Sequence, residues 1–183
     1  LMIVVCGGIK GGGGKTTVAT NLAVMRSLAG KDVLLVDADE QDSASDFTVV
    51  RNEVMQAKGG AGYTSIRLRG TAVRSEVSRM APKYDDVVID AGGRDSQGHR
   101  AALLVSDLYL VPLFPGSFDV WTITPVGQLI DEAAAFNERL KSVCFLNRAD
   151  ANGGENEEAA QIVKETTGLD YLDFPIGFRK AFR

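Results

Sequence analysis

Short apolar runs alternate with amphipathic stretches along the chain. Several runs have no polar residue between their ends, which is typical of strands buried on both faces of a sheet. The pattern predicts strands over residues 2–6, 32–37, 63–68, 86–90, 107–113, 142–146 and 171–175. Helical spacing and helix-ending glycines or prolines predict helices over residues 15–28, 71–80, 97–105, 119–140 and 155–167. This alternation predicts a three-layer α/β fold, a mainly parallel sheet with helices on both faces, in one domain over residues 1–183.

The composition is that of an ordinary globular domain. Of the 183 residues, 45% are hydrophobic and 24% are charged, so one domain with a sizeable core is expected. The 20 basic and 24 acidic side chains give a net charge of −4. This charge excludes a uniformly basic nucleic-acid-binding protein but is compatible with a local basic patch.

We expect a cytoplasmic location. No apolar run approaches the about 18 residues that a transmembrane helix needs. Residues 2–6 lead directly into glycines, without the basic segment and cleavage site of a signal peptide. The two cysteines, Cys6 and Cys144, lie far apart in the sequence and form no CxxC pair, which favours a reducing compartment.

A glycine-rich segment between the first strand and the first helix has the context of a phosphate-binding P-loop. Residues 7–17 read Gly-Gly-Ile-Lys-Gly-Gly-Gly-Gly-Lys-Thr-Thr. Glycines let backbone N–H groups turn toward phosphate oxygens, and the helix N-terminus adds partial positive charge. The motif assigns nucleotide binding to Gly11, Gly12, Gly13, Gly14, Lys15, Thr16 and Thr17. We therefore predict a P-loop NTPase fold with ATP and Mg²⁺ as cofactors, Lys15 on the β- and γ-phosphates and the Thr16 hydroxyl on Mg²⁺. A glycine turn that binds nothing is the alternative.

The loop departs from the common pattern at one position. G-x-x-x-x-G-K-[ST] requires a glycine where Ile9 stands, and Lys10 follows. In this respect the loop resembles that of the deviant Walker A ATPases, which include the ParA and MinD proteins. The resemblance implies that Lys10 is the signature lysine, which reaches across a nucleotide-sandwich dimer to the partner's phosphates, as an arginine finger does. Ile9 favours the ParA type, because MinD-type loops usually carry glycine before this lysine. A solvated loop charge is the alternative for Lys10.

Three aspartates end or follow predicted strands. Asp37 and Asp39 lie in a segment that resembles the family's Asp-x-Asp-Pro-Gln, and Asp90 ends a strand that resembles a Walker B strand with a switch loop after it. Carboxylates at such strand ends can hold Mg²⁺ through waters or orient an attacking water. The resemblance implies that Asp39 orients the water, with Lys10 and Lys15 as the other catalytic residues. It also implies that Asp37 and Asp90, with Thr16 and Asp39, serve the metal. Ordinary turn formation is the alternative for the Asp37 and Asp39 pair.

The resemblance assigns three further segments. Asn147 would hydrogen-bond the adenine edge and Arg148 would stack on the ring, while Pro175 lies in the second adenine-side segment. Arg94 and Asp95 are candidates for the dimer face. Residues 111–119 resemble the family's Pro-x-x-Pro-x-x-x-Asp turn, which either caps the next helix or lies on the dimer face. An ordinary exit from a strand is the alternative for the adenine side.

The resemblance implies a weak, partner-stimulated ATPase that positions a cargo. Such a protein forms an ATP-dependent homodimer, binds nucleoid DNA non-specifically, and moves a plasmid, chromosome or protein cargo through a ParB-like or cargo-adaptor protein, without a membrane. A MinD-like membrane-cycling ATPase is one alternative, and it needs a C-terminal amphipathic helix that does not occur before Arg183. A small-molecule synthetase or redox ATPase of the same fold is another. ParA-like chains usually continue into a further helix, and we expect this chain to stop at its start.

Basic side chains gather in two stretches that are candidates for DNA contact, although solvated surface charge explains them equally well. They are Arg67, Arg69, Arg74 and Arg79 in the first stretch, and Arg179, Lys180 and Arg183 in the second.

Overall fold

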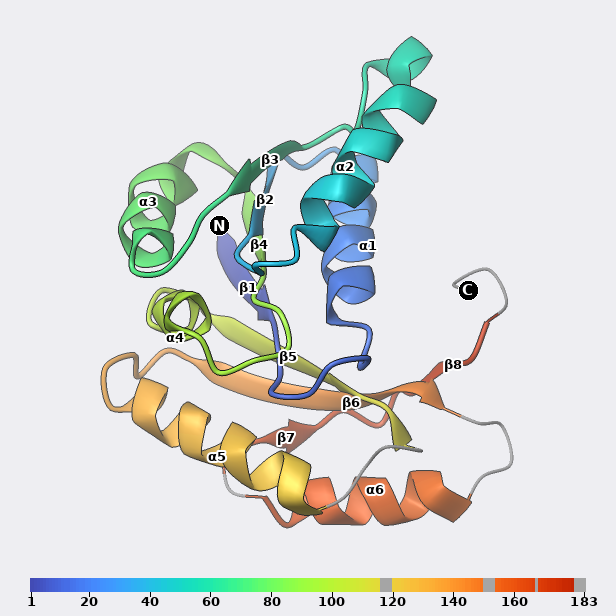
Figure 1. Cartoon of the computed structure of the whole chain (residues 1–183), viewed down its shortest axis with the longest axis vertical. Coiled ribbons are helices and arrows are strands. Elements are labelled where there is room, and N and C mark those ends of the chain that lie inside the picture. The colour runs from blue at the N-terminus through green and yellow to red at the C-terminus, as the bar shows by residue number, and fades with distance from the viewer. Residues whose placement is uncertain (116–119, 150–153, 167, 180–183) are drawn as a thin grey trace.

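The computed structural model describes residues 1–115, 120–149, 154–166 and 168–179, and it contains one parallel sheet. The strand order is β3-β2-β4-β1-β5-β6-β7, and β8 pairs with β6 (Figure 1). Every pairing among these strands is parallel, so the predicted sheet is confirmed. The strands are β1 (Met2–Cys6), β2 (Val33–Asp37), β3 (Thr64–Arg67), β4 (Asp86–Asp90), β5 (Leu108–Leu113), β6 (Lys141–Ala149), β7 (Asp170–Tyr171) and β8 (Ile176–Gly177).

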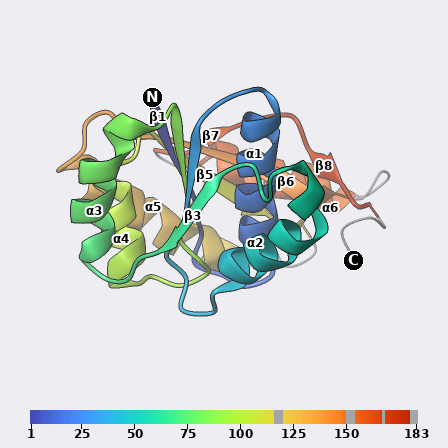
Figure 2. The same cartoon turned by 90° about the horizontal axis from the view of Figure 1, so that it is seen from above.

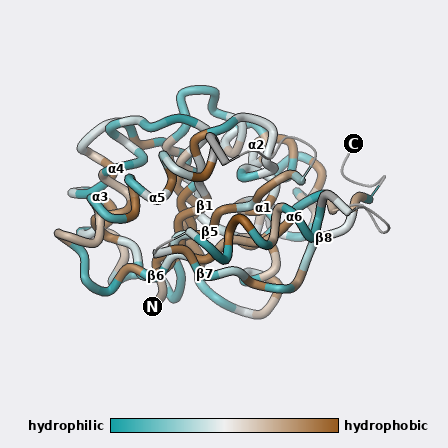
Figure 3. The backbone as a smooth tube through the Cα atoms, turned by 90° about the horizontal axis from the view of Figure 1, so that it is seen from below, coloured by the Kyte–Doolittle hydropathy of each residue, from teal (hydrophilic) through white to brown (hydrophobic). Residues whose placement is uncertain are grey.

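Helices cover both faces of this sheet, as Figure 2 shows. One apolar layer packs helices α3, α4 and α5 against the sheet, and a second packs α1 and α2 against the other face. Brown apolar segments accordingly concentrate in the central strands in Figure 3. The helices are α1 (Lys15–Leu28), α2 (Ser43–Val54), α3 (Ala72–Met80), α4 (Gln97–Leu103), α5 (Val120–Ala134) and α6 (Gly154–Lys164), with short 3₁₀ turns at Gln56–Lys58 and Ala81–Lys83.

Three central strands end at the same level of the sheet. In the β1–β4 pairing Cys6 lies opposite Asp90, and in the β2–β4 pairing Asp37 lies opposite Asp90. The loops that follow β1, β4 and β2 therefore leave the sheet side by side at its carboxyl edge, where open α/β sheets bind their ligands.

Some boundaries differ from the sequence prediction. Helix α5 ends at Ala134, well before residue 140. The chain turns there because the buried Asn137 side chain donates hydrogen bonds to the carbonyls of Leu103 and Ser106, at 2.8 and 2.7 Å. Strand β6 runs on to Ala149, because the pairing with β8 extends its end. The predicted strand 171–175 is replaced by β7 and β8.

Candidate functional site

The glycine-rich loop folds back over the start of α1. Gly12 and Gly14 both have φ 83°, in the left-handed region that favours glycine, and Gly14 caps α1. A Cβ atom on Gly13 would lie 2.8 Å from the Pro112 carbonyl oxygen, and one on Gly14 would lie 2.2 Å from Nδ2 of Asn147. The loop therefore needs glycine at these positions. It leads into the N-terminus of α1, where free backbone N–H groups and the helix dipole favour an anion.

Lys15 turns into this loop. Its side chain is buried, and Nζ donates a hydrogen bond of 2.5 Å to the carbonyl oxygen of Lys10. Burial lowers the pKa of Lys15, while the carboxylates of Asp90 and Asp39 offset part of this fall. The predicted phosphate lysine thus lies inside the loop, whereas the predicted signature lysine, Lys10, is exposed at its edge.

Asp90 lies fully buried at the end of β4. Neither oxygen of its carboxylate has a hydrogen-bond partner in the described part of the chain. Burial raises the pKa of Asp90 to about 6; the nearby Thr16 hydroxyl lowers it and the Asp37 carboxylate raises it. An orphaned buried carboxylate beside Thr16 fits a hydrated Mg²⁺ ion. Among the described residues, no group of three His, Cys, Asp or Glu side chains could hold a metal ion by itself.

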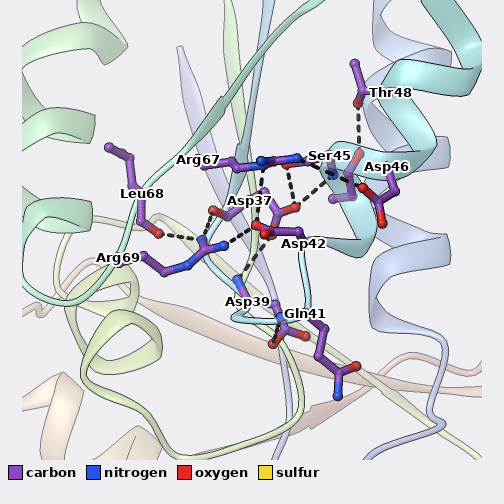
Figure 4. Close-up of polar contacts among 11 residues, drawn as sticks. Asp37, Asp39, Gln41, Asp42, Ser45, Asp46, Thr48, Arg67, Leu68 and Arg69 are labelled. Carbon is purple, nitrogen blue, oxygen red and sulfur yellow. Dashed lines mark hydrogen bonds and ion pairs between the residues drawn. The ribbon is translucent and has the colours of Figure 1, made fainter.

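Asp37 has a structural task at the end of β2. One carboxylate oxygen, Oδ2, accepts hydrogen bonds from both the backbone N–H and the hydroxyl of Ser45, each at 2.7 Å (Figure 4). The other oxygen, Oδ1, accepts one from the backbone N–H of Asp39 at 3.2 Å. The carboxylate therefore joins the loop after β2 to the first turn of α2, and the predicted role of Asp37 in the metal shell stays a prediction.

Asp39 faces the loop that follows β4. A Cβ atom on Gly92 would lie 2.6–2.9 Å from the Asp39 carboxylate, and Gly92 has φ 74°. A Cβ atom on Gly93 would lie 3.1 Å from Nζ of Lys15. The Gly92–Gly93 segment thus lies against both the predicted water-orienting aspartate and the phosphate lysine, which is the placement expected of a switch loop.

His99 is a residue of this region that sequence reasoning missed. It is fully buried in α4, and its ring Nδ1 lies 3.1 Å from the Arg94 carbonyl oxygen in the loop that follows β4. A Cβ atom on Gly7 would lie 2.6 Å from its Nε2, so the ring packs beneath the start of the phosphate loop. Burial lowers the pKa of His99. A single histidine carries no sequence pattern that would have revealed this position.

A cavity of about 360 Å³ opens beside the phosphate loop and is lined by Thr17, Asn21, Leu22, Asn147, Arg148, Phe174 and Phe178, among others. Nδ2 of Asn147 donates to the carbonyl oxygen of Gly13 at 2.8 Å, so this amide is turned to the phosphate loop. The Arg148 guanidinium lies over the rings of Phe114 and Phe178, 5.4 and 5.6 Å from their centres. Pro175 is absent from the lining, although its neighbours Phe174 and Ile176 contribute.

Comparisons with known proteins identify the family. The model of the CobQ/CobB/MinD/ParA nucleotide binding domain matches residues 3–183. The chain belongs to this family. Maintenance of carboxysome distribution protein A from Halothiobacillus neapolitanus is 27% identical over 176 residues, which cover 96% of this chain and 79% of that protein. The predicted kinship with ParA and MinD is thereby confirmed at the level of the family.

Solved structures share the fold of this family member. A putative plasmid partition protein from Borrelia burgdorferi B31 bound to AMPPNP has a TM-score of 0.76 at 19% identity and covers 100% of this chain and 89% of that chain. Cobyrinic acid a,c-diamide synthase from Mycobacterium smegmatis with bound ADP and magnesium has a TM-score of 0.81 at 17% identity and covers 98% of this chain and 87% of that chain. The predicted P-loop NTPase fold is confirmed.

Several of the arginines predicted to contact DNA form ion pairs with acidic side chains of the same chain. Arg69 pairs with Asp42, and Arg67 pairs with the same carboxylate at 3.3 Å. Arg79 pairs with a glutamate one helical turn earlier, while Arg74 is exposed. Lys180 and Arg183 lie outside the described residues.

Two of the predicted dimer-face residues, Arg94 and Asp95, lie in the loop between β4 and α4. Asp95 accepts hydrogen bonds of 2.6 and 2.7 Å from Arg100, which lower its pKa. Arg94 is exposed beside it. Residues 116–119 of the predicted turn lie outside the description. Within the described residues, no helix has the length and apolar character needed to cross a membrane.

Proposed function

We propose that this protein is a positioning ATPase of the ParA type. It binds ATP with Mg²⁺, hydrolyses ATP slowly, forms an ATP-sandwich dimer, and in that state binds DNA and moves a cargo through an adaptor protein. The observation that carries the proposal is the pair of lysines in one loop. Lys15 is buried inside the phosphate loop, whereas Lys10 is exposed at its edge, so the two lysines have different tasks.

The residues around the loop divide the work on ATP. Backbone N–H groups of Gly11–Thr17 hold the phosphates, and Lys15 neutralises their charge. A bound Mg²⁺ ion would stabilise the charge that develops on the phosphates, and the Thr16 hydroxyl and the Asp90 carboxylate would hold it. Asp39 lies against the switch loop, where its carboxylate orients the attacking water. The cavity beside Asn147 and Arg148 takes the base.

The proposed dimer depends on Lys10. Lys15 already serves the β- and γ-phosphates of its own subunit, so a second lysine is most useful on the neighbour's phosphates. Two such contacts, related by a two-fold axis, would make ATP part of the interface. ADP lacks the γ-phosphate, and the dimer loosens after hydrolysis. Basic residues of both subunits then act as one DNA-binding surface only with ATP. The relative that maintains carboxysome distribution and the neighbour described as a plasmid partition protein support a positioning role.

The test compares the protein with ATP, ADP and no nucleotide in light scattering and in retention on DNA. The wild-type protein should dimerise and bind DNA only with ATP. Lys10→Ala should bind ATP but remain a monomer that does not retain DNA. Lys83→Ala is the matched control, because Lys83 is also an exposed lysine but precedes β4, at the end of the sheet opposite to the phosphate loop. A Lys10→Ala protein that dimerises like the wild type would contradict the proposal.

A small-molecule synthetase is the second candidate function. One observation favours it: the likeness to the structure described as cobyrinic acid a,c-diamide synthase, at a TM-score of 0.81. A synthetase would use ATP to activate a carboxylate, and its ATP consumption would depend on a small acid and an amide donor rather than on DNA or an adaptor. ATP turnover that is unaffected by DNA, in a protein that stays monomeric with ATP, would favour this second candidate.

A further inference from the structure

The segment between β2 and α2 carries Asp39 without any regular secondary structure to hold it. Its backbone turns back at Asp42, where φ is 56°, a left-handed conformation that is uncommon outside glycine, although aspartate adopts it more readily than most residues. The N–H of Asp42 donates to the carbonyl oxygen of Asp39 at 3.2 Å. Such a conformation persists only where surrounding contacts determine it, and it is common at functional sites. The contacts that fix this loop therefore matter for Asp39.

Arg69 contacts both ends of this loop from outside it. Arg67 also pairs with the Asp42 carboxylate, at 3.3 Å. The Leu68 N–H donates to the Asp37 carbonyl oxygen at 3.0 Å, but each of these groups reaches one end only. Arg69 lies just after β3, and its Nη1 donates to the carbonyl oxygen of Asp37 at 2.7 Å and to that of Leu68 at 3.0 Å. Its Nη2 donates to the Asp42 carboxylate (Figure 4). One planar guanidinium thus joins the start of the loop to its end, which the single ammonium of a lysine cannot do.

The Asp39 side chain lies tightly against the loop that follows β4. The Asp39 carboxylate is so close to Gly92 that a single added methyl group would collide with it. A loop shift of about 1 Å would change the relation of this carboxylate to the switch loop, and shifts of that size cost reaction rates of the order of 100-fold when a reacting group is misplaced.

We propose that Arg69 is a positioning residue of the hydrolytic site, which acts through Asp39 by fixing both ends of the loop that carries it. This inference rests on the proposed ATPase function. It gives Arg69 a task different from the DNA contact expected from the sequence, since its guanidinium is already committed to the Asp37 carbonyl and the Asp42 carboxylate.

The test is single-turnover ATP hydrolysis by Arg69→Ala, Asp39→Ala and the double variant, with ATP affinity measured in parallel. Arg69→Ala should hydrolyse ATP about 10- to 100-fold more slowly, with its dissociation constant for ATP unchanged within about twofold. In the Asp39→Ala background the same change should cost nothing further, because the residue it positions is already gone. Arg69→Lys should remain slow, because it keeps the charge without spanning the loop. Arg79→Ala is the matched control, since Arg79 is exposed and pairs with Glu76 within α3, away from the loop that carries Asp39.

Two results would overturn the inference. One is an equal loss of rate in both backgrounds, which points to a general structural effect. The other is normal hydrolysis by Arg69→Ala together with lost retention on DNA, which places the arginine on a DNA surface.

Amide hydrogen exchange keeps this test separate from the proposed function. If the wild-type protein does not hydrolyse ATP, the proposed function fails, but the loop can still be examined. Arg69→Ala should speed exchange at Asp39 and Asp42, whose amides lie within the loop, and leave exchange in α3 unchanged. Unchanged exchange at both loop amides would overturn the role of Arg69 by itself.

Discussion

Replacing Gly14 by alanine tests how closely the phosphate loop depends on its contact with β6. Gly14 and Gly12 have the same φ of 83°, so alanine meets the same backbone strain at both positions, about 1–2 kcal/mol. The gain from a less flexible unfolded chain is also the same. The surroundings differ: an added Cβ atom meets nothing within 4 Å at Gly12, but would lie 2.2 Å from Nδ2 of Asn147 at Gly14.

The difference between the two variants measures this contact. In Gly14→Ala the Asn147 amide must move, and its 2.8 Å hydrogen bond to the Gly13 carbonyl is lost. Such a bond contributes about 1 kcal/mol, and a forced rotamer adds about 0.5–1.5 kcal/mol. We therefore expect Gly14→Ala to lower the free energy of unfolding by about 1.5–2.5 kcal/mol more than Gly12→Ala.

Urea denaturation of both variants, each in the wild-type and in an Asn147→Ala background, gives the four free energies needed. The difference between the alanine variants should vanish when Asn147 is absent. Equal destabilisation in the wild-type background, or a difference that persists without Asn147, would refute the reasoning.

Three further predictions concern the chemistry of the site. Lys15→Ala removes the buried ammonium of the phosphate loop and should abolish tight ATP binding; unchanged affinity in calorimetry would contradict the assignment. Asp39→Ala should retain ATP binding and lower turnover by about 100-fold or more, because a water-orienting group acts mainly in the transition state; a normal steady-state rate would count against that role. Burial raises the pKa of Asp90 from 3.8 to about 6. The folded protein therefore favours the protonated form of Asp90. The free energy of unfolding is highest below pH about 4, the pKa in the unfolded chain, and falls by about 3 kcal/mol as the pH rises through about 6, the pKa in the folded protein. Urea denaturation over this pH range should show this fall in the free energy of unfolding for the wild-type protein without ligand, but not for Asp90→Asn. Parallel pH profiles for the two proteins would contradict the prediction.

The strands and the phosphate loop could be predicted because their signals are local. An uninterrupted apolar run such as Val33–Val36 specifies a doubly buried strand, and the structure places every residue of it in the core. The loop was predictable because glycine is needed for positive φ at Gly12 and Gly14. Strands β1 and β4 also end where the prediction placed their ends, because each apolar run stops where the chain turns out of the sheet.

The remainder depends on contacts that the sequence does not display. Helix α2 was not predicted, because its exposed side carries Phe47, Val50 and Val54, which obscure the amphipathic pattern. The attachment of Asn147 to the Gly13 carbonyl joins residues 134 positions apart. The engagement of Arg69 with the loop after β2 was likewise hidden, because an arginine in a basic stretch looks the same whether it meets solvent, DNA or a carbonyl oxygen.

The site arises from strand register more than from any single motif. Because Cys6, Asp90 and Asp37 are paired across adjacent parallel strands, the phosphate loop, the switch loop and the loop that carries Asp39 leave the sheet together. Side chains alternate between the faces of a strand, so slipping β4 by one residue would turn Asp90 away from Lys15 and onto the opposite face. The apolar residues of β4 would have to exchange faces at the same time, and these residues lie in both core layers. The packing that stabilises the sheet therefore also fixes the points at which these loops leave it, and with them the relative positions of Asp37 and Asp90. Asp39 lies beyond the end of β2, so its position depends in addition on contacts such as those that Arg69 makes with its loop.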